Sequence, residues 1–330
     1  MKYRKLGRSS LEVSEVGFGA WSIGTNWWGE ISEHKSEELL KRAFSLGVNF
    51  FDTADAYGDG QSERFISRLL KSRRDRIVLS TKFGYDIYSK QDRKGHEERK
   101  QDFSSEFIRF ALQKSLERLE TDYIDLYQIH NPRMNIINDA KVFETLEDLR
   151  KEGKIRFYGV ALGPAIGWLD EGLRAMKTTD TTSLQTVYNM LEQDPGREFF
   201  KAARERDVGI LVRVPHASGL LDGKFEPNTN FGNDDHRSYR MREWLLKGYA
   251  KMDALKFLTE GKGRTLAQVA IKFALAEKSV SSVLPTITSL TELEEYAKAS
   301  DLADLGDDEI VRINDFYENV FRISVPSLIV

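Results

Sequence analysis

The sequence predicts an α/β protein with a (β/α)8 fold, a TIM barrel, formed as a single domain from residues 1–330. Short apolar runs rich in β-branched residues recur eight times, amphipathic helical stretches lie between them, and the chain of 330 residues suits one such barrel. A doubly wound sheet would have fewer repeats and a G-x-G-x-x-G turn near the first strand. The early stretch "GFGAWSIG" lacks the third glycine at the required spacing.

Each apolar run is typical of a buried parallel strand, because both faces of such a strand are covered. The runs are "VSEVGFGAW" from 13, "VNFFD" from 48, "RIVLSTKF" from 76, "YIDLYQIH" from 123, "IRFYGVAL" from 155, "SLQTVY" from 183, "VGILVRV" from 208 and "SVSSVLP" from 279. Strand and helix patterns alternate throughout the chain, as the barrel requires.

Helical patterns between the strands begin with Ser, Asn or Asp caps, and several end at glycine. They cover residues 34–47, 104–120, 138–153 and 194–207. The segments outside the repeat are an N-terminal β-hairpin at 2–14, a charged insertion at 88–102, a long loop at 217–237 and an extra helix at 307–319. The charged insertion could be a substrate-grasping loop, because it follows the third strand pattern and so should lie on the active-site face, but we favour its interpretation as a solvated surface.

Composition limits the classes of partner. The chain has 49 basic and 52 acidic residues, so no net positive field favours nucleic acid or a membrane surface. Without cysteine there is no disulfide, thiolate metal site or cysteine nucleophile. The histidines at 34, 96 and 236 lie in polar segments without metal-ligand spacing, so we expect no metal. With neither a secretory signal nor a membrane span in the sequence, we expect a cytoplasmic protein.

Polar residues that end the apolar runs are the candidates for chemistry, because a barrel places its active site at the carboxyl ends of its strands. Asp52, Lys82 and His130 end three successive runs, and Tyr57 follows Asp52 in the next loop. A nearby ammonium lowers the pKa of a phenol from about 10 by roughly 1 to 3 units. We therefore expect Tyr57 to act as an acid, Asp52 to keep Lys82 charged, and His130 to orient a carbonyl oxygen.

None of these side chains can deliver two electrons, so a hydride donor such as a nicotinamide cofactor is implied. A metal-dependent barrel hydrolase would need His and carboxylate ligands at several strand ends. His130 alone is available there.

Over nearly its whole length the chain resembles the aldo-keto reductase superfamily. The resemblance rests on the motifs "GFGAW", "FDTADAYG", "STKFG", "LYQIHNP", "GKIRFYGVA", "LQTVYN", "SGLLDGK" and "LPTITSLTELEE". It implies a catalytic tetrad of Asp52, Tyr57, Lys82 and His130, with Tyr57 as the general acid. It also implies that Ala20, Trp21, Asp52 and Gln185 contact the cofactor.

The same resemblance implies that Trp21, Tyr57 and His130 face the substrate. Trp28, with Trp27 beside it in "TNWWGE", is a candidate for the substrate opening, with packing of the loop onto the barrel as the equal alternative. The resemblance places further cofactor contacts on the segment after the seventh barrel strand, on the loop that follows and on the last strand and helix. These predicted contacts are Arg213, Val214, Pro215, His216, Lys224, Arg237, Thr286, Thr288, Glu292 and Glu295.

Several positions depart from the family pattern. Ala161 and Leu162 replace the usual Ser-Asn pair, so the carboxamide contacts of that pair are missing. Arg213 stands where many members stack an aromatic ring on the nicotinamide, and a guanidinium can also lie flat on a ring. Glu292 replaces a glutamine and Tyr296 an asparagine, which weakens the basic grip on a 2′-phosphate.

We therefore expect NADP(H) in preference to NAD(H), with NAD(H) as the open alternative, and we expect Lys224 and Arg237 to restore positive charge near the pyrophosphate. The predicted function is NAD(P)H-dependent reduction of an aldehyde or ketone, or the reverse oxidation, by a monomer acting on a small molecule. The alternative is a regulatory or redox-sensing barrel that binds the cofactor with little turnover.

Overall fold

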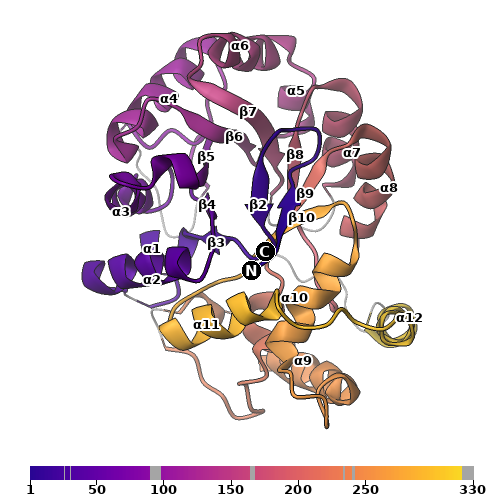
Figure 1. Cartoon of the computed structure of the whole chain (residues 1–330). Helices are drawn as coiled ribbons and strands as arrows, with labels where there is room; N and C mark the ends of the chain where they lie inside the picture. Colours follow the sequence, from indigo (N-terminus) through magenta and orange to yellow (C-terminus); the bar gives the residue numbers. More distant parts are fainter. Residues whose placement is uncertain are drawn as a thin grey trace.

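A computed structural model describes residues 1–25, 27–29, 31–89, 98–163, 168–232, 235–239 and 242–321. Eight parallel strands form a nearly closed barrel, which confirms the predicted fold class (Figure 1). They are β3 (Phe18–Gly19), β4 (Phe50–Asp52), β5 (Val78–Phe83), β6 (Ile124–His130), β7 (Ile155–Ala161), β8 (Ser183–Val187), β9 (Gly209–Arg213) and β10 (Val280–Leu284). Parallel bridges from Val16 to Val283 and from Gly19 to Thr286 join the first and last strands.

Helices surround the barrel (Figure 1). Those that follow the strands in turn are α2 (Glu33–Ser45), α3 (Gln61–Leu70), α4 (Ser105–Leu119), α6 (Ala140–Lys151), α7 (Leu169–Thr178), α8 (Gly196–Arg206), α10 (Leu266–Ala276) and α11 (Leu290–Ala299). Additional helices are α1 (Trp21–Gly24), α5 (Met134–Ile137), α9 (Arg242–Ala254) and α12 (Asp307–Phe316). The predicted extra helix at 307–319 corresponds to α12 and the π-helical turn Tyr317–Phe321 that follows.

Local sequence explains where these helices begin. The Ser104 hydroxyl accepts a hydrogen bond from the Phe107 amide and caps α4, and Ser32 caps α2 in the same way. At the start of α10, Thr265 and Gln268 form a reciprocal capping box. The α4 helix ends at Glu120, which adopts a left-handed conformation with φ of 52°.

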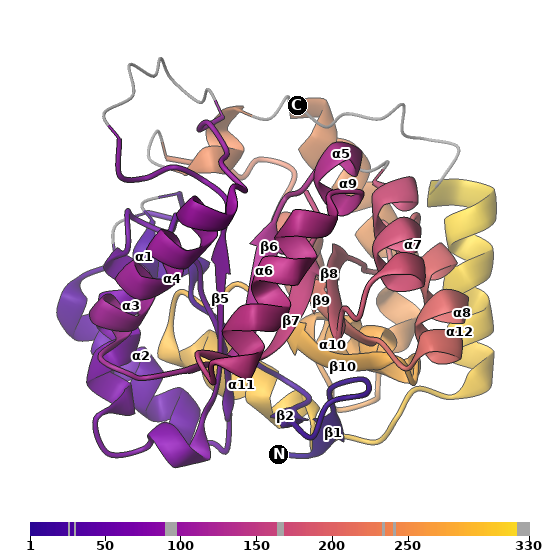
Figure 2. The ribbon, with the colours of Figure 1, turned by 90° about the horizontal axis from the view of Figure 1, so that it is seen from above.

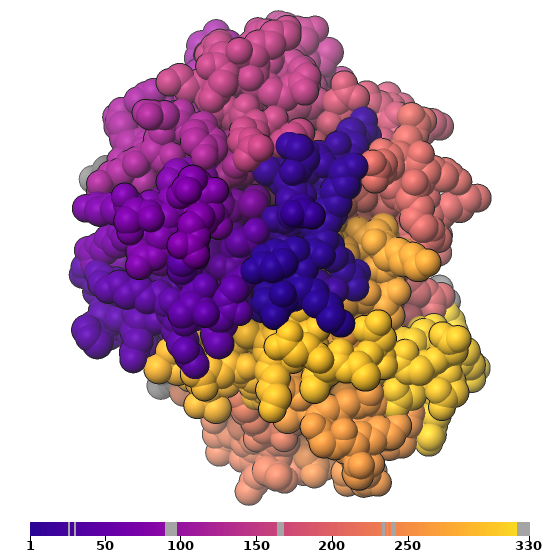
Figure 3. Space-filling view, in the orientation of Figure 1, coloured from indigo at the N-terminus to yellow at the C-terminus, as the bar shows by residue number. Residues whose placement is uncertain are grey.

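The N-terminal hairpin closes one end of the barrel. Strands β1 (Tyr3–Lys5) and β2 (Glu12–Ser14) pair antiparallel, as predicted. Leu6, Leu11 and Val13 from the hairpin pack in one cluster with Phe50 and Leu126, which come from inside the barrel. Figure 2 shows the hairpin at the amino ends of the strands, and in Figure 3 the indigo N-terminal residues cover the centre of that face.

Residues 90–97, which include His96 and most of the predicted insertion, lie outside the described ranges. Among the described residues, no helix has the length and apolar character needed to cross a bilayer.

Candidate active site

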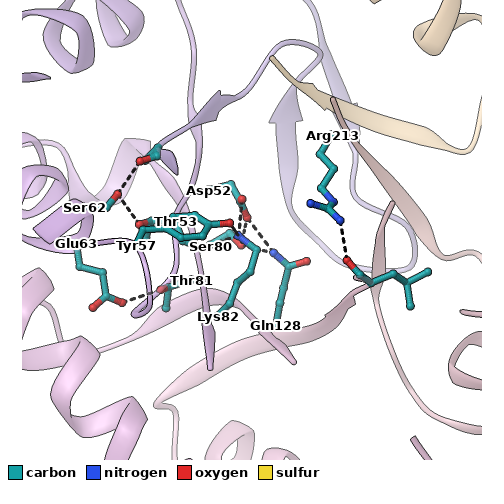
Figure 4. A network of polar contacts seen from close by, with 12 residues as sticks. Asp52, Thr53, Tyr57, Ser62, Glu63, Ser80, Thr81, Lys82, Gln128 and Arg213 are labelled. Atoms are coloured by element: carbon teal, nitrogen blue, oxygen red, sulfur yellow. Dashed lines mark hydrogen bonds and ion pairs between the residues drawn. The ribbon is translucent and has the colours of Figure 1, made fainter. Parts of the chain in front are cut away.

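The four predicted catalytic side chains meet at the carboxyl end of the barrel. Asp52 ends β4, Lys82 is the penultimate residue of β5 and His130 ends β6, while Tyr57 lies in the loop between β4 and α3. Parallel pairing aligns Asp52 with Ser80 and Lys82 with Gln128. Figure 4 shows Asp52, Tyr57 and Lys82 converging from these elements.

The Lys82 ammonium is the centre of the network. Its Nζ donates to Asp52 Oδ2 at 2.6 Å and to the Thr53 carbonyl at 2.7 Å, and it lies 3.3 Å from Tyr57 Oη. The side chain is fully buried. Burial lowers the pKa of Lys82, but the charge of Asp52 and the neighbouring Tyr57 outweigh it, so the pKa lies above its ordinary value. Lys82 is therefore a charged ammonium beside a phenol.

Two residues that the sequence analysis missed hold the other oxygen of Asp52. Ser80 Oγ and Gln128 Nε2 each donate to Asp52 Oδ1 at 2.9 Å, and Gln128 Nε2 also donates to Ser80 Oγ at 2.8 Å. Each lies two positions before Lys82 or His130 on the same strand. Since alternate strand residues share a face, this spacing was a signal that both point into the barrel.

His130 is enclosed by aromatic rings. Its ring makes edge contacts with Tyr57 at 5.9 Å and with Tyr85 at 5.1 Å between centroids. Burial, and then the charges of Lys82 and Arg213, hold the pKa of His130 well below its usual range. The imidazole is therefore neutral at physiological pH, and one of its nitrogens carries the single proton available for donation.

The returning end of the charged insertion contacts this site, although Glu98 and Lys100 in it are exposed. Tyr85 Oη donates to Glu98 at 2.6 Å, and Gln101 Nε2 donates to the His130 carbonyl at 2.9 Å. Arg99 forms an ion pair with Asp59 at 2.5 Å. These contacts join the loop of Tyr57 to the end of β6, and charge composition alone gives no sign of such specific partners.

Aromatic side chains surround the mouth of the barrel. The Trp21 ring lies 5.7 Å from Trp27 and 5.9 Å from Trp28, between centroids. Trp28 also forms an antiparallel bridge with Asp235 of the long loop. Arg237, predicted to bind the pyrophosphate, pairs with Asp235 at 2.5 Å and lies over the Trp28 ring at 4.6 Å. The guanidinium of Arg237 therefore already has partners in Asp235 and Trp28.

Donors without protein partners occur at the ends of β8 and β9. Gln185 Nε2 and Arg213 Nε are buried and have no hydrogen-bond partner, whereas Arg213 Nη2 donates to the Leu162 carbonyl at 3.0 Å. Buried polar groups are almost always satisfied, so these donors indicate a ligand with acceptor atoms. The carboxamide of a nicotinamide has this chemistry, and the residues present therefore fit such a cofactor.

The segment after β9 has an unusual backbone. Val214 has φ of 56°, a left-handed conformation that is strained for a β-branched residue, and its carbonyl accepts from Asn189 Nδ2 at 3.0 Å. Pro215 is buried.

At the start of the barrel, Ala20 is buried, and its carbonyl accepts a hydrogen bond from Ser62 Oγ at 3.0 Å.

The His216 side chain, a predicted cofactor contact, bonds within the protein. Its Nδ1 lies 3.0 Å from Asp222 Oδ1 and its Nε2 lies 3.2 Å from the Ala267 carbonyl. Tyr296 Oη donates to the same Asp222 oxygen at 3.0 Å and is fully buried. Both ring nitrogens of His216 therefore have partners inside the protein. These partners come from other segments of the chain, so the sequence motif alone does not reveal them.

The last predicted cofactor contacts are partly engaged with one another. Glu292 accepts from the Thr288 amide at 2.9 Å and the Thr288 hydroxyl at 2.8 Å, and Lys224 Nζ lies 3.3 Å from its other oxygen. Thr286 is half-buried beside Gly19, and the Glu295 carbonyl accepts from Gln268. The positive charge of Lys224 is thus offset by a carboxylate.

Asp55, in the turn between Asp52 and Tyr57, is completely buried, and neither carboxylate oxygen has a side-chain partner among the described residues. Burial, and then the nearby Glu63 carboxylate, raise the pKa of Asp55 well above its usual range. Glu63 is itself buried and holds Arg118 at 2.5 Å and Thr81 at 2.7 Å. Asp55 therefore belongs to a buried polar cluster next to the loop of Tyr57.

Within the described ranges, no group of three or more His, Cys, Asp or Glu residues could hold a metal ion.

Comparison with known proteins agrees with this geometry. The model of the "Aldo/keto reductase family" matches residues 15–318. An uncharacterized oxidoreductase, YqkF of Bacillus subtilis, is 31% identical over 313 residues, which cover 94% of each chain. L-galactose dehydrogenase of Arabidopsis thaliana is 28% identical, with 99% of this chain and 98% of that protein covered.

Solved structures give the same result. The holo form of the aldo-keto reductase AKR11C1 from Bacillus halodurans is 33% identical, covers 96% of each chain and superposes with a TM-score of 0.76. The glycerol dehydrogenase AKR11B4 from Gluconobacter oxydans, 24% identical with 99% of each chain covered, shares the fold with a TM-score of 0.82. The chain therefore belongs to the aldo/keto reductase family of NAD(P)H-dependent oxidoreductases.

Proposed function

We propose that this protein reduces an aldehyde or ketone to an alcohol with NAD(P)H, or catalyses the reverse oxidation, and that Tyr57 donates the proton. The observation that carries this proposal is the position of Lys82 Nζ, which lies 2.6 Å from Asp52 Oδ2 and 3.3 Å from Tyr57 Oη. A phenol with a fixed ammonium beside it is suited to protonate an oxygen that is gaining negative charge.

In the proposed reaction the carbonyl oxygen lies against Tyr57 Oη. When Tyr57 releases its proton, the Lys82 ammonium stabilises the remaining phenolate through a short contact in a buried site. The neutral His130 imidazole donates a hydrogen bond that orients the same oxygen. The nicotinamide, when bound, supplies the hydride for the carbonyl carbon.

Asp52 has an electrostatic and positioning role in this proposal. It holds the ammonium through Oδ2, and the donors Ser80 and Gln128 stabilise its charge through Oδ1. A buried lysine without this carboxylate would tend to lose its proton. Asp52 therefore maintains the charge on which the acidity of Tyr57 depends.

We assign cofactor binding to the strand ends beside this network. Gln185 would bind the nicotinamide carboxamide through its unpartnered Nε2, and Arg213 would lie against the nicotinamide ring. The other residues that we expect to contact the cofactor are Ala20, Trp21, Val214, Pro215, Thr286, Thr288 and Glu295. NADP(H) stays our preferred cofactor over NAD(H), although the Lys224 charge needed for a 2′-phosphate faces Glu292.

The substrate is proposed to approach Tyr57 and His130 beside the contacting rings of Trp21 and Trp28, whose centroids lie 5.9 Å apart. This arrangement suits a small carbonyl compound or alcohol. That the protein works as a cytoplasmic monomer stays a prediction from the sequence.

The test is to mix the protein with NADPH and, in parallel, NADH in the presence of nitrobenzaldehyde, and to follow the loss of nicotinamide absorbance. Turnover with either cofactor supports the proposal. No turnover with either cofactor across a broad panel of aldehydes and ketones would overturn it. The regulatory alternative is not favoured, since Asp52, Tyr57, Lys82 and His130 are all present and in contact range.

A further inference from the structure

Arg213 brings to the active site a positive charge that no carboxylate of the described residues contacts. Lys82 is paired with Asp52 at 2.6 Å, and His130 is neutral. Arg213 donates to the Leu162 carbonyl at 3.0 Å and its Nε is buried without a partner. In the part of the chain that the structure describes, Arg213 forms no ion pair with Asp or Glu. A guanidinium does not lose its proton in proteins, so this charge is permanent.

Arg213 lies among the groups that surround the reacting atoms. It ends β9 and pairs in register with Val187 of β8 and Leu284 of β10. Figure 4 shows it facing the network of Asp52, Lys82 and Gln128. Its charge helps to lower the pKa of His130, and the charge of Asp52 acts in turn on Arg213.

Hydride transfer places the nicotinamide in this environment. The donor carbon must approach the carbonyl carbon to about 3 to 3.5 Å, while the carbonyl oxygen contacts Tyr57 Oη. The ring must therefore lie among the same groups, Arg213 included. A guanidinium can lie against the neutral ring of NAD(P)H, but the ring of NAD(P)⁺ carries a positive charge and is repelled, strongly so in a buried site.

We propose that Arg213 makes this site select the reduced cofactor over the oxidised one. The selection goes beyond the proposed function but rests on it, because it presupposes that the nicotinamide binds at the ends of β8 and β9. Its consequence is a protein that is loaded with NAD(P)H when both forms are present and that releases NAD(P)⁺ readily. Oxidised cofactor is then a weak product inhibitor of carbonyl reduction.

The experiment measures dissociation constants for NADPH and NADP⁺, and for NADH and NAD⁺, by quenching of tryptophan fluorescence. For the wild type we expect the reduced form to bind about tenfold more tightly or better, the effect of one repulsive charge contact in a partly screened site. Arg213→Met should bring the ratio close to one, whereas Arg213→Lys, which keeps the charge, should retain much of it.

Arg133→Met is the matched control. Arg133 is exposed, follows β6 at the same end of the barrel, and lies over the Trp168 ring at 4.0 Å. The Arg133→Met variant loses the same charge as Arg213→Met. Its ratio of dissociation constants for the oxidised and reduced cofactor should nevertheless equal that of the wild type. Circular dichroism establishes that each variant is folded. If Arg213→Met does not fold, Arg213→Gln, which also removes the charge, takes its place.

Equal affinity of the wild type for the reduced and oxidised cofactor overturns the selection by Arg213. It is also overturned if folded Arg213→Met keeps the wild-type ratio of the two dissociation constants. A protein that binds neither form overturns the proposed function as well. The two failures are therefore distinct, since the first appears in the ratio and the second in the absolute affinity.

Discussion

At the scale of single residues, the site depends on buried charges whose partners are fixed by short contacts. Lys82 has no exposure to solvent and takes its charge balance from Asp52, which in turn accepts from Ser80 and Gln128. Removing one member of such a network leaves its partners buried without a hydrogen bond. The loss of unfolding free energy therefore exceeds the contribution of the lost contact alone.

Tyr57→Phe removes the proposed acid and leaves the rest of the ring in place. We expect turnover to fall by about 10² to 10⁴, the range for a positioned general acid, while the cofactor dissociation constant changes little. Tyr3→Phe, which removes the hydroxyl of a tyrosine that is 49% exposed, should keep full activity. A fully active Tyr57→Phe would remove the proposed mechanism.

Asp55→Asn tests the buried polar cluster through its pH dependence. Because the folded pKa of Asp55 is raised well above the unfolded value of about 3.9, folding retains a proton that the unfolded chain releases. The wild type should therefore lose stability as the pH rises above about 4, by up to about 1.4 kcal/mol per pH unit until the folded pKa is reached.

The asparagine cannot ionise, so the free energy of unfolding of Asp55→Asn relative to that of the wild type should rise as the pH increases above about 4, until the folded pKa of Asp55 is reached. Denaturant titrations at several pH values measure this difference. The exposed Asp75→Asn is the control for loss of a carboxylate. A difference that stays constant with pH would show that Asp55 is ionised in the folded protein.

At the scale of elements, the loop between β4 and α3 is placed by close backbone contact. Gly58 has φ of 61°, and a Cβ at this position would collide with the Gly24 carbonyl oxygen of α1. The next turn contains Gly60, whose Cβ would collide with Arg118. The path of the loop, and with it the position of Tyr57, therefore requires glycine at both positions.

Gly58→Ala should cost more than backbone strain, because the loop must move away from α1. We expect a loss of about 2 kcal/mol or more in unfolding free energy and at least a tenfold loss of turnover. Gly153→Ala is the matched control: its φ is 71° and no atom lies within 4 Å of the new Cβ. It should lose about 1 kcal/mol with turnover unchanged, and equal effects of both substitutions would refute the proposed contact.

The strands and caps were predictable because their signals are local. All eight apolar runs became barrel strands, and Ser104 caps α4 where its pattern begins. The partners of the site were not predictable in this way. Strand alternation indicates that Gln128 points into the barrel, but not that it reaches Asp52 across 76 positions, and the side chain of His216 pairs with Asp222 and the Ala267 carbonyl. Such contacts depend on how loops pack, which neither periodicity nor composition encodes.

At the scale of the whole molecule, stability and chemistry lie at opposite ends of one barrel. The hairpin residues Leu6, Leu11 and Val13 fill the amino end, and the polar network occupies the carboxyl end. This division is common in barrels of this type, where conservation of one face serves folding and the other face serves catalysis. Substitutions at the two ends should therefore separate the two properties.

Leu11→Ala tests this separation. Leu11 is 3% exposed and lies in the cluster that closes the amino end, so its truncation should cost about 2 to 5 kcal/mol of unfolding free energy through lost burial and a cavity. Turnover at a temperature where the variant is folded should be unchanged. Val311→Ala, at a residue that is 58% exposed, should alter neither quantity. A large loss of turnover in folded Leu11→Ala would show that the two ends are coupled.

The hairpin also bears on access to the site. Leu6, Leu11 and Val13 fill the amino end of a barrel whose interior is packed with side chains, so in the proposed reaction the cofactor and the carbonyl compound both approach from the carboxyl end. We therefore expect one of the two to bind first and to leave last, which initial-rate measurements with both concentrations varied would show.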